Sequence, residues 1–261
     1  MQLATWNVNS LAVRLPQVLD WLAANPVDLL CLQELKLTDD KFPHDALQAA
    51  GYTAAAFGQK TYNGVAILSR HPLRDVVRNI TGLQDEQSRV IAATVDAPGG
   101  PLRVVNGYFV NGQAPGTDKF TYKMGWLDGL QAMLRNELQA HPRLALLGDF
   151  NITADDRDSY DPEGLRETIH HTSEERTHFQ ALLALGLSDA FRMFEQPEKS
   201  YSWWDYRDFG FRRNRGLRID HILVSEALKP LVTACTIDKL PRKNERPSDH
   251  TPVVVDLSLA G

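Results

Sequence analysis

Polar residues with side chains suited to catalysis follow several apolar stretches of the sequence. Asn7 follows the first stretch, and Glu34 follows the stretch around Cys31. The other members of this group are Tyr108, Asp149, Asn151, Asp220, Asp249 and His250. The group is rich in carboxylate and amide oxygens and contains no cysteine, so it suits Mg²⁺ or Mn²⁺ better than a structural zinc. Such a set indicates hydrolysis of a phosphate ester, in which a carboxylate or His takes the proton of the attacking water.

Each of these residues alone has a structural explanation. Asn and Asp are common in turns, and His250 beside Asp249 could be a buried, hydrogen-bonded pair. The combination favours a catalytic site. Motifs of other chemistries are absent from the sequence, which has no Gly-rich phosphate loop ending in Lys-Ser or Lys-Thr, no G-x-G-x-x-G after a strand and no G-x-S-x-G.

The spacing of apolar residues predicts the elements that would position this group. Helices are predicted over residues 11–24, 42–50, 120–140 and 174–185, the last with Ser173 as its cap. Short apolar runs bounded by turn residues predict strands over residues 2–6, 28–32, 52–57, 64–69, 90–95, 102–108, 144–147, 216–224, 231–240 and 251–257. No helix is expected between the strands from residue 52 to residue 108. We therefore expect an α/β (α+β) protein with two mostly antiparallel sheets packed face to face and helices outside.

Length and composition predict a single domain over residues 1–261. The 261 residues are 43% apolar, and 28 basic against 33 acidic residues give a net charge of −5. A chain of this size can bury a large core without disulfides or a structural metal. No apolar run is long enough to span a membrane. The only cysteines, Cys31 and Cys235, lie far apart, which favours a reducing, cytoplasmic setting.

Seven sequence motifs resemble those of the endonuclease/exonuclease/phosphatase superfamily, and in particular its exonuclease III group. Five of them carry the group of polar residues apart from Tyr108: residues 5–10 (TWNVNS), 32–36 (LQELK), 148–151 (GDFN), 216–221 (GLRIDH) and 247–250 (PSDH). Residues 58–67 (GQKTYNGVAI) and 201–207 (YSWWDYR) narrow the resemblance to DNA-repair nucleases. The resemblance runs from Met1 to Asp256.

This resemblance implies a four-layered α/β-sandwich and Mg²⁺-dependent attack on a DNA phosphodiester. By motif, Glu34 matches the principal metal ligand, with Asn7 beside it as a metal or phosphate contact. Asp149 matches the acid that activates water or serves the leaving group. Tyr108 and Asn151 match phosphate-orienting donors. His250 matches the phosphate-binding or proton-handling His, Asp220 its partner, and Asp249 a second candidate metal ligand. The implied metal-site residues are therefore Asn7, Glu34, Asp149, Asn151, Asp249 and His250.

Basic, polar and aromatic residues in predicted loops and at helix starts are candidates for contact with double-stranded DNA. They are Lys36, Lys60, Tyr62, Asn63, Arg89, Asn111, Lys119, Lys123, Trp203, Arg207 and Leu217. A solvated charged face is the alternative for the basic residues. Residues 203–218 also interleave aromatics with Arg, and within residues 207–218 five Arg stand against Asp208 alone; such a pattern suits an unstacked nucleotide or a frayed end.

Three departures from the exonuclease III pattern bear on the substrate. Asn111 stands where relatives more often have Pro-Gln, and Leu217 stands where some carry a Trp wall of the abasic-sugar pocket. His170 and His171 lie in a loop near the DNA, where a bulky side chain could narrow that pocket. These differences favour processing of 3′ ends over incision at internal abasic sites.

The sequence thus predicts a 3′–5′ exonuclease on double-stranded DNA that also removes 3′ blocking phosphates, with abasic-site incision as a further activity. A phosphatase of the same fold acting on a small phosphoester is the first alternative, and a non-catalytic DNA-binding module is the second. A monomer without membrane association is expected.

Overall fold

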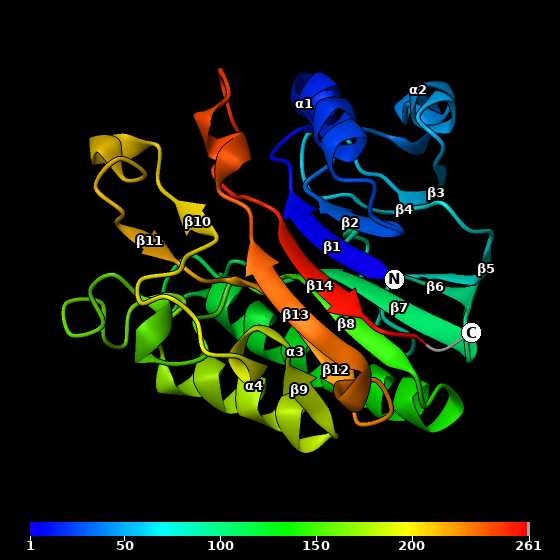
Figure 1. Ribbon diagram of the computed structural model, residues 1–261. Coiled ribbons are helices and arrows are strands. Elements are labelled where there is room, and N and C mark those ends of the chain that lie inside the picture. Colours follow the sequence, from blue (N-terminus) through cyan, green and yellow to red (C-terminus); the bar gives the residue numbers. More distant parts are fainter. Residues whose placement is uncertain (260–261) are drawn as a thin grey trace.

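Two six-stranded sheets face each other in the computed structural model, which describes residues 1–259 (Figure 1). The first sheet has the order β13 (Val232–Ile237), β14 (Val253–Leu257), β1 (Gln2–Asn7), β2 (Leu29–Gln33), β4 (Val65–Ser69) and β3 (Thr53–Phe57). The second has the order β5 (Leu73–Arg78), β6 (Val90–Ala97), β7 (Gly100–Tyr108), β8 (Leu144–Asp149), β12 (Asp220–Ser225) and β9 (Leu187–Asp189). Only the pairs β1–β2 and β7–β8 are parallel, so the prediction of mostly antiparallel sheets is confirmed.

Helices cover the outer face of each sheet. Helices α1 (Leu11–Ala24) and α2 (His44–Ala49) lie over the first sheet, and α3 (Asp118–Ala140) and α4 (Ser173–Ala184) lie over the second (Figure 1). A short hairpin, β10 (Trp203–Trp204) with β11 (Gly216–Leu217), stands apart from both sheets. Single 3₁₀ turns occur at Asp39–Lys41, Asp156–Asp158, Phe191–Met193, Arg207–Phe209, Lys229–Leu231 and Leu240–Lys243. These layers confirm the expected four-layered sandwich.

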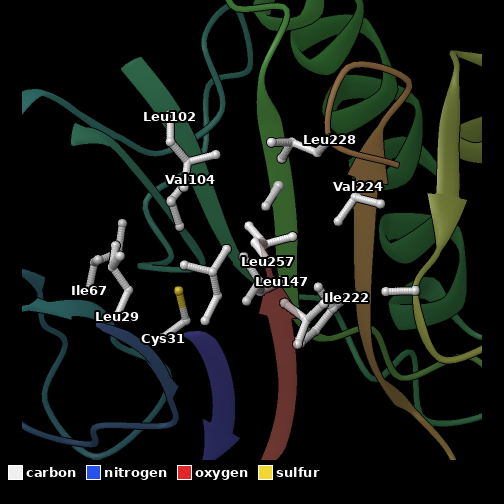
Figure 2. Close-up of a cluster of buried hydrophobic side chains, with 14 of the residues drawn as sticks. Leu29, Cys31, Ile67, Leu102, Val104, Leu147, Ile222, Val224, Leu228 and Leu257 are labelled. Carbon is white, nitrogen blue, oxygen red and sulfur yellow. The ribbon is translucent and has the colours of Figure 1, made fainter. Parts of the chain in front are cut away.

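The central strands are apolar on both faces because both faces are covered. On β2, Leu29 and Cys31 point into the core between the sheets, whereas Leu30 and Leu32 pack under α1 and α2. Figure 2 shows the core between the sheets, where Leu29, Cys31 and Ile67 face Leu147 and Ile222 of the second sheet. Burying side chains on both faces explains why the predicted strands appear as continuous apolar runs.

Several predicted boundaries were wrong, each for a local reason. Strands β5 and β9 were missed because β5 is a half-exposed edge strand and β9 has only three residues. The predicted strand 216–224 divides into β11 and β12. The predicted strand 231–240 ends at Ile237, because Pro241 belongs to a 3₁₀ turn. Helix α4 is capped by Thr172 rather than Ser173, since the Thr172 side chain accepts from the Glu175 amide and Glu175 bonds back to Thr172.

A buried amide joins the two sheets just behind the rim where the candidate residues lie. Asn106 of β7 donates from Nδ2 to the carbonyls of Leu32 and Ala66, at 2.9 and 2.8 Å, in the opposite sheet. Its Oδ1 accepts a bond of 2.8 Å from Gln33 Nε2, which also donates to Thr5 Oγ1 at 2.9 Å. Gln33 directly precedes Glu34, so this cross-sheet bond fixes the position from which Glu34 leaves β2.

We predict that Asn106→Leu lowers the free energy of unfolding by about 2–4 kcal/mol, because buried carbonyls and the Gln33 amide lose a partner. Urea denaturation measures this change, and Asn136→Leu on the exposed face of α3 provides the matched control. Equal stability of Asn106→Leu and wild type would contradict a role for this bond in joining the sheets.

A buried ion-pair cluster joins the loop after β8 to the segment between β11 and β12. Arg218 donates from Nε to Asp158 Oδ1 at 2.7 Å and from Nη2 to Asp189 Oδ2 at 2.7 Å. Arg192 also contacts Asp158. Burial opposes ionisation of Asp158, but the Arg218 and Arg192 guanidinium groups outweigh it and hold the pKa of this carboxyl well below its usual value. The cluster therefore stabilises two of the segments that surround the site.

The lowered pKa of Asp158 predicts how stability depends on pH. A carboxyl whose folded-state pKa lies below its unfolded value of about 3.9 stabilises the protein at pH values above the unfolded pKa, and this contribution is lost as pH falls toward the folded-state pKa. Asp158→Asn should lower the unfolding free energy by ~3 kcal/mol or more at pH 7, because it breaks a buried pair. The difference from wild type should narrow toward pH 3 in urea titrations. A difference that stays constant across this range would contradict the assignment.

No helix in residues 1–259 is both long enough and apolar enough to cross a membrane.

Candidate active site

The ends of six strands bring the candidate residues to one rim of the sandwich. Asn7 ends β1, and Glu34 directly follows β2, its parallel neighbour. In the second sheet Tyr108, Asp149 and Asp220 lie side by side, because Tyr108 pairs with Asp149 and Asp149 pairs with Asp220. His250 and Asp249 precede β14. The sheet register therefore brings together residues that are more than 200 positions apart in the sequence.

Two carboxylates share one amide donor at the centre of this rim. Asn7 Nδ2 donates to Glu34 Oε1 and to Asp149 Oδ2, each at 2.9 Å. Glu34 also contacts Lys36, with 3.2 Å between Oε2 and Nζ. Asp149 is almost fully buried, and burial raises the pKa of its carboxyl, with His250 opposing the rise.

The donor set of this rim fits a divalent cation. One ligand atom from each of Glu34, Asp149 and His250 lies within 4.8 Å of the others. Two carboxylates close together are the hard oxygen donors that Mg²⁺ or Mn²⁺ takes, with water or substrate oxygens completing the shell. A cation there would also relieve the repulsion between Glu34 and Asp149.

His250 is held between two acids. Its Nδ1 lies 2.9 Å from Asp220 Oδ2, and its Nε2 lies 3.6 Å from Asp149 Oδ2. Burial disfavours the charged imidazolium, but Asp220 and Asp149 outweigh this effect and raise the pKa of His250. Ser202 Oγ donates to Asp220 Oδ2 at 2.6 Å, so Asp220 is itself fixed. This chain of bonds sets the orientation of the ring and directs Nε2 toward Asp149.

Asn151 and Tyr108 complete the rim with neutral groups. The backbone N–H of Asn151 donates to Asp149 Oδ1 at 3.0 Å, and the side-chain Nδ2 of Asn151 donates to the Phe109 carbonyl at 2.9 Å. Burial, together with Glu34 and Asp149, raises the pKa of the Tyr108 phenol well above its usual value. Tyr108 therefore keeps its proton and can donate to a phosphate oxygen.

Asp249 lies at the rim but outside the group of Glu34, Asp149 and His250. Its Oδ1 accepts from Asn9 Nδ2 at 3.1 Å, and its Oδ2 accepts from Trp203 Nε1 at 2.9 Å. Both carboxylate oxygens thus have donors already. In this arrangement Asp249 anchors Trp203 and Asn9 beside the site.

A small cavity opens among these residues, and a larger one lies next to it. The first has a volume of about 170 Å³ and is lined by Glu34, Tyr108, Asn111, Asp149, Asn151, His170, Trp203, Ile219, Asp249 and His250. The second, of about 440 Å³, is lined by residues 160–171 and 203–217 in part, including Leu217. His170 and Trp203 line both cavities. These two side chains therefore separate the catalytic cavity from its larger neighbour.

His170 is fixed in this dividing position. Its Nδ1 lies 2.7 Å from the Asn151 carbonyl, and its backbone amide donates to Glu175 Oε1 at 3.2 Å. Its backbone φ of 71° is in the left-handed region, which is uncommon for residues other than glycine. Burial and the nearby Lys123 lower the pKa of His170 to about 3. The ring is neutral at pH 7 and contributes bulk without charge.

Most of the predicted DNA contacts lie around this rim. Lys60, Tyr62, Lys119 and Arg207 are exposed, and Asn111 lines the catalytic cavity. The Arg89 guanidinium lies 4.9 Å from the centre of the Tyr108 ring. Other members of the set are less free: Asn63 is buried and bonded to Gln59, Lys36 bonds to Asn9 and Glu34, and Leu217 is buried in β11.

Two basic residues were misjudged from the sequence. Lys123 is fully buried, where its Nζ contacts Glu175 and donates to the Asn151 and Asn111 carbonyls at 2.8 and 3.1 Å. A lysine near the start of α3 was expected to be exposed, but the neighbouring helix α4 covers its side chain. Arg218 is likewise buried in the Asp158 cluster. Neither guanidinium nor ammonium group is available to a DNA phosphate.

Sequence reasoning missed the residues that support this site from behind. Asn106, Ser202 and Glu175 were not predicted, and Gln33 appeared only as a motif neighbour of Glu34. The available signal was weak. Asn106 is a polar residue inside an apolar run, 103–108 (RVVNGY), and such residues are buried only when they have partners, whereas Glu175 lies among other polar residues and gave no such signal.

Comparison with known proteins agrees with this geometry. Residues 4–250 match the Endonuclease/Exonuclease/phosphatase family. The chain is 35% identical to "Exodeoxyribonuclease III" of Haemophilus influenzae, over 97% of this chain and 98% of that protein. The structure of the 3′ phosphatase NExo from Neisseria, bound to a product DNA hairpin, has a TM-score of 0.95 and 51% identity and covers 98% of this chain and 99% of that one. An AP endonuclease from Archaeoglobus fulgidus has a TM-score of 0.93 and 32% identity, covering 98% of this chain and 99% of that one.

The likeness extends over nearly the whole chain. The chain therefore belongs to the Endonuclease/Exonuclease/phosphatase family, and within it to the exonuclease III group of hydrolytic DNA-repair nucleases.

Proposed function

We propose that this chain hydrolyses phosphoesters at the 3′ ends of double-stranded DNA, removing 3′ phosphates and terminal nucleotides, and that it incises internal abasic sites poorly. The observation that carries this proposal is His170, which stands between the catalytic cavity and the larger cavity beside it. A cavity of about 170 Å³ suits a phosphoryl group. A displaced sugar at an internal abasic site would need room beyond the His170 ring.

Enzymes of this family depend on a divalent metal, and we propose Mg²⁺, with Mn²⁺ as a substitute. Glu34 and Asp149 would hold it, with His250 near the same point. Asn7 would act by holding the two carboxylates, and Asp249 by holding Trp203. The metal would polarise the phosphoryl oxygen and so make phosphorus more open to attack.

The protein's own groups divide the remaining tasks. We propose that Asp149 takes a proton from the attacking water, because its carboxylate lines the catalytic cavity beside the other polar groups of the rim. His250, kept protonated by Asp220, donates a hydrogen bond to a phosphate oxygen through Nε2. Tyr108 and Asn151 orient the phosphate with neutral donors. The backbone of DNA on either side would lie along Lys60, Tyr62, Arg89, Asn111 and Arg207, with Trp203 and Leu217 bounding the site.

The activities for which the related structures are described support this assignment. The 51% identical structure is described as a 3′ phosphatase with a DNA hairpin product, whereas the 32% identical one is described as an AP endonuclease. Neither the geometry nor these relatives favours the alternative of a small-phosphoester phosphatase. We further propose that the chain acts as a monomeric single domain in the cytoplasm.

We predict that Glu34→Ala, Asp149→Asn and His250→Ala each lower turnover on a 3′-phosphorylated nick by about 1000-fold or more, because they act as one unit on one transition state. A gel assay in Mg²⁺ follows phosphate removal, with EDTA as the inactive control. Asp20→Asn, the same change on the exposed face of α1, is the matched control and should retain full activity. Turnover that survives in Asp149→Asn would contradict the assignment.

We predict that His170→Gly raises incision at an internal abasic site by at least about tenfold while 3′-phosphate removal stays within a few-fold of wild type. Glycine adopts the positive φ of this position without strain, and its substitution joins the two cavities. His171→Ala is the control, because His171 lines only the larger cavity. Unchanged abasic-site incision by His170→Gly would contradict the proposal that the His170 side chain excludes the displaced sugar.

A further inference from the structure

A lysine and a glutamate from two different helices form an ion pair that is wholly shut off from solvent. Lys123 lies near the start of α3 and Glu175 lies in the first turn of α4, and both side chains are 0% exposed. The two helices lie side by side over the second sheet (Figure 1). Removing both charges from water is costly, and two apolar side chains of similar volume are often as stable or more stable. Stability alone therefore does not explain this pair.

Every donor of the Lys123 ammonium group has an acceptor. One N–H contacts Glu175, and the other two donate to the backbone carbonyls of Asn151 and Asn111, at 2.8 and 3.1 Å. An ammonium group has three donors, so this set is complete. The two asparagines come from different loops, because Asn151 follows β8 and Asn111 follows β7. A single buried side chain therefore joins both loops to α3 and α4.

The Glu175 carboxylate is equally occupied. Its Oε1 accepts from Lys123 and, at 3.2 Å, from the backbone N–H of His170. Its Oε2 accepts from the backbone N–H and the hydroxyl of Thr172, at 3.1 and 2.8 Å. A carboxylate can accept about four hydrogen bonds, so the acceptor positions of Glu175 are filled. Through Glu175 the ion pair also holds the backbone of His170.

The loop after β7 makes room for the lysine at Gly112. A Cβ atom at this position would lie 2.9 Å from Lys123 Cδ, which is too close, and the φ of Gly112 is +86°. Both features favour glycine. The Lys123 stem cannot move aside without losing the bonds of its ammonium group. The backbone of this loop is therefore fitted to the course of the lysine side chain.

The residues that the pair holds line the catalytic cavity, as Asn111, Asn151 and His170 all do. Asn151 has a φ of 51°, in the left-handed region, and its backbone N–H donates to Asp149 Oδ1 at 3.0 Å. The Asn151 carbonyl accepts from Lys123 and lies 2.7 Å from His170 Nδ1. Bonds thus fix the peptide group on each side of Asn151. The direction of the Asn151 side chain, and its backbone bond to Asp149, therefore depend on the ion pair.

We infer that Lys123 and Glu175 are positioning residues for hydrolysis, which hold the backbone of Asn151 so that its side chain meets the phosphate in the geometry of the transition state. They touch no substrate themselves, because both are fully buried and neither lines the catalytic cavity. A misplacement of about 1 Å in a positioned group can cost about 100-fold in rate. The inference rests on the proposed function, because it takes Asn151 to orient the phosphate of a DNA 3′ end.

A double variant separates positioning from stability. Lys123→Met/Glu175→Gln removes both charges but keeps side chains of similar length, and Gln can also form the capping box of α4. In urea it should be more stable than Lys123→Met, which leaves the buried Glu175 charge without a partner. On a 3′-phosphorylated nick in Mg²⁺ its kcat should fall about 10- to 100-fold. Its KM should stay within about threefold of wild type, because the exposed residues that we propose contact DNA are unchanged.

A second buried ion pair provides the matched control. Arg103 of β7 and Glu137 of α3 are 2% and 16% exposed, with 2.6 Å between Nε and Oε2, and Arg103 also donates to the Asp75 carbonyl at 2.7 Å. Arg103→Met/Glu137→Gln therefore loses the same kinds of contact. Neither residue lines the catalytic cavity, so kcat of this variant should stay within about twofold of wild type.

Glu175→Gln alone tests the inference if the double variant does not fold. It keeps the length of the side chain and weakens the hold on Lys123, so kcat should fall at least about threefold, whereas Glu137→Gln should leave it unchanged. A kcat equal to that of wild type in the double variant, or in Glu175→Gln where only that variant folds, would overturn the inference. An equal loss of kcat in the Arg103→Met/Glu137→Gln control would also overturn it, since any buried ion pair would then have the same effect.

Failure of the proposed function would look different. Wild type would then leave 3′ phosphates in place, and the same variants would be compared on whichever DNA phosphoester it does hydrolyse, a recessed 3′ end or an internal abasic site. A fall in kcat of the double variant on that substrate would keep the positioning role and refute the 3′-phosphate activity. Normal removal of 3′ phosphates by both wild type and the double variant would do the reverse.

Discussion

The close approach of the Glu34 and Asp149 carboxylates is the constraint on which the rest of the site depends. Two like charges in a largely buried position repel each other, and the fold offsets this with a shared donor, Asn7, and with a cationic His250 on the far side of Asp149. Asp220 in turn keeps His250 charged and oriented. The site is thus an assembly of opposed charges that a cation and a phosphate group can enter in place of water.

Holding these groups against their repulsion requires that both sheets be fixed relative to each other. The cross-sheet bonds of Asn106 and Gln33 do this directly behind Glu34. Strain gathers at the same rim, because Glu34, Asn151 and His170 all have positive φ values. Glu34 and Asn151 turn the chain sharply just after a strand, His170 does so in the loop before α4, and the surrounding bonds hold them there. The same network that positions the catalytic groups therefore also positions the residue that we propose limits the substrate.

The sequence predicted the architecture and the central residues better than it predicted their surroundings. Continuous apolar runs marked the buried strands, and polar residues next to them marked the rim, after the strand at Glu34 and Asp149 and before it at His250. An edge strand such as β5 left no comparable pattern, since its side chains are half exposed. Lys123 was misassigned because a sequence shows that a lysine lies at a helix start but does not show that another helix covers it. Three-dimensional pairing decides such cases, as with Asn106, whose partners lie about 40 and 74 residues away.

The account rests on the claim that the cavity between Glu34, Asp149 and His250 holds a divalent cation and the phosphate of a DNA 3′ end. A crystal structure of the Asp149→Asn variant with Mn²⁺ and a 3′-phosphorylated duplex tests this claim directly through anomalous scattering. We expect an anomalous peak bonded to Glu34, the 3′ phosphate beside His250, Asn151 and Tyr108, and His170 closing the far side. A phosphate bound outside this cavity, or Mn²⁺ found only elsewhere on the protein, would contradict the account.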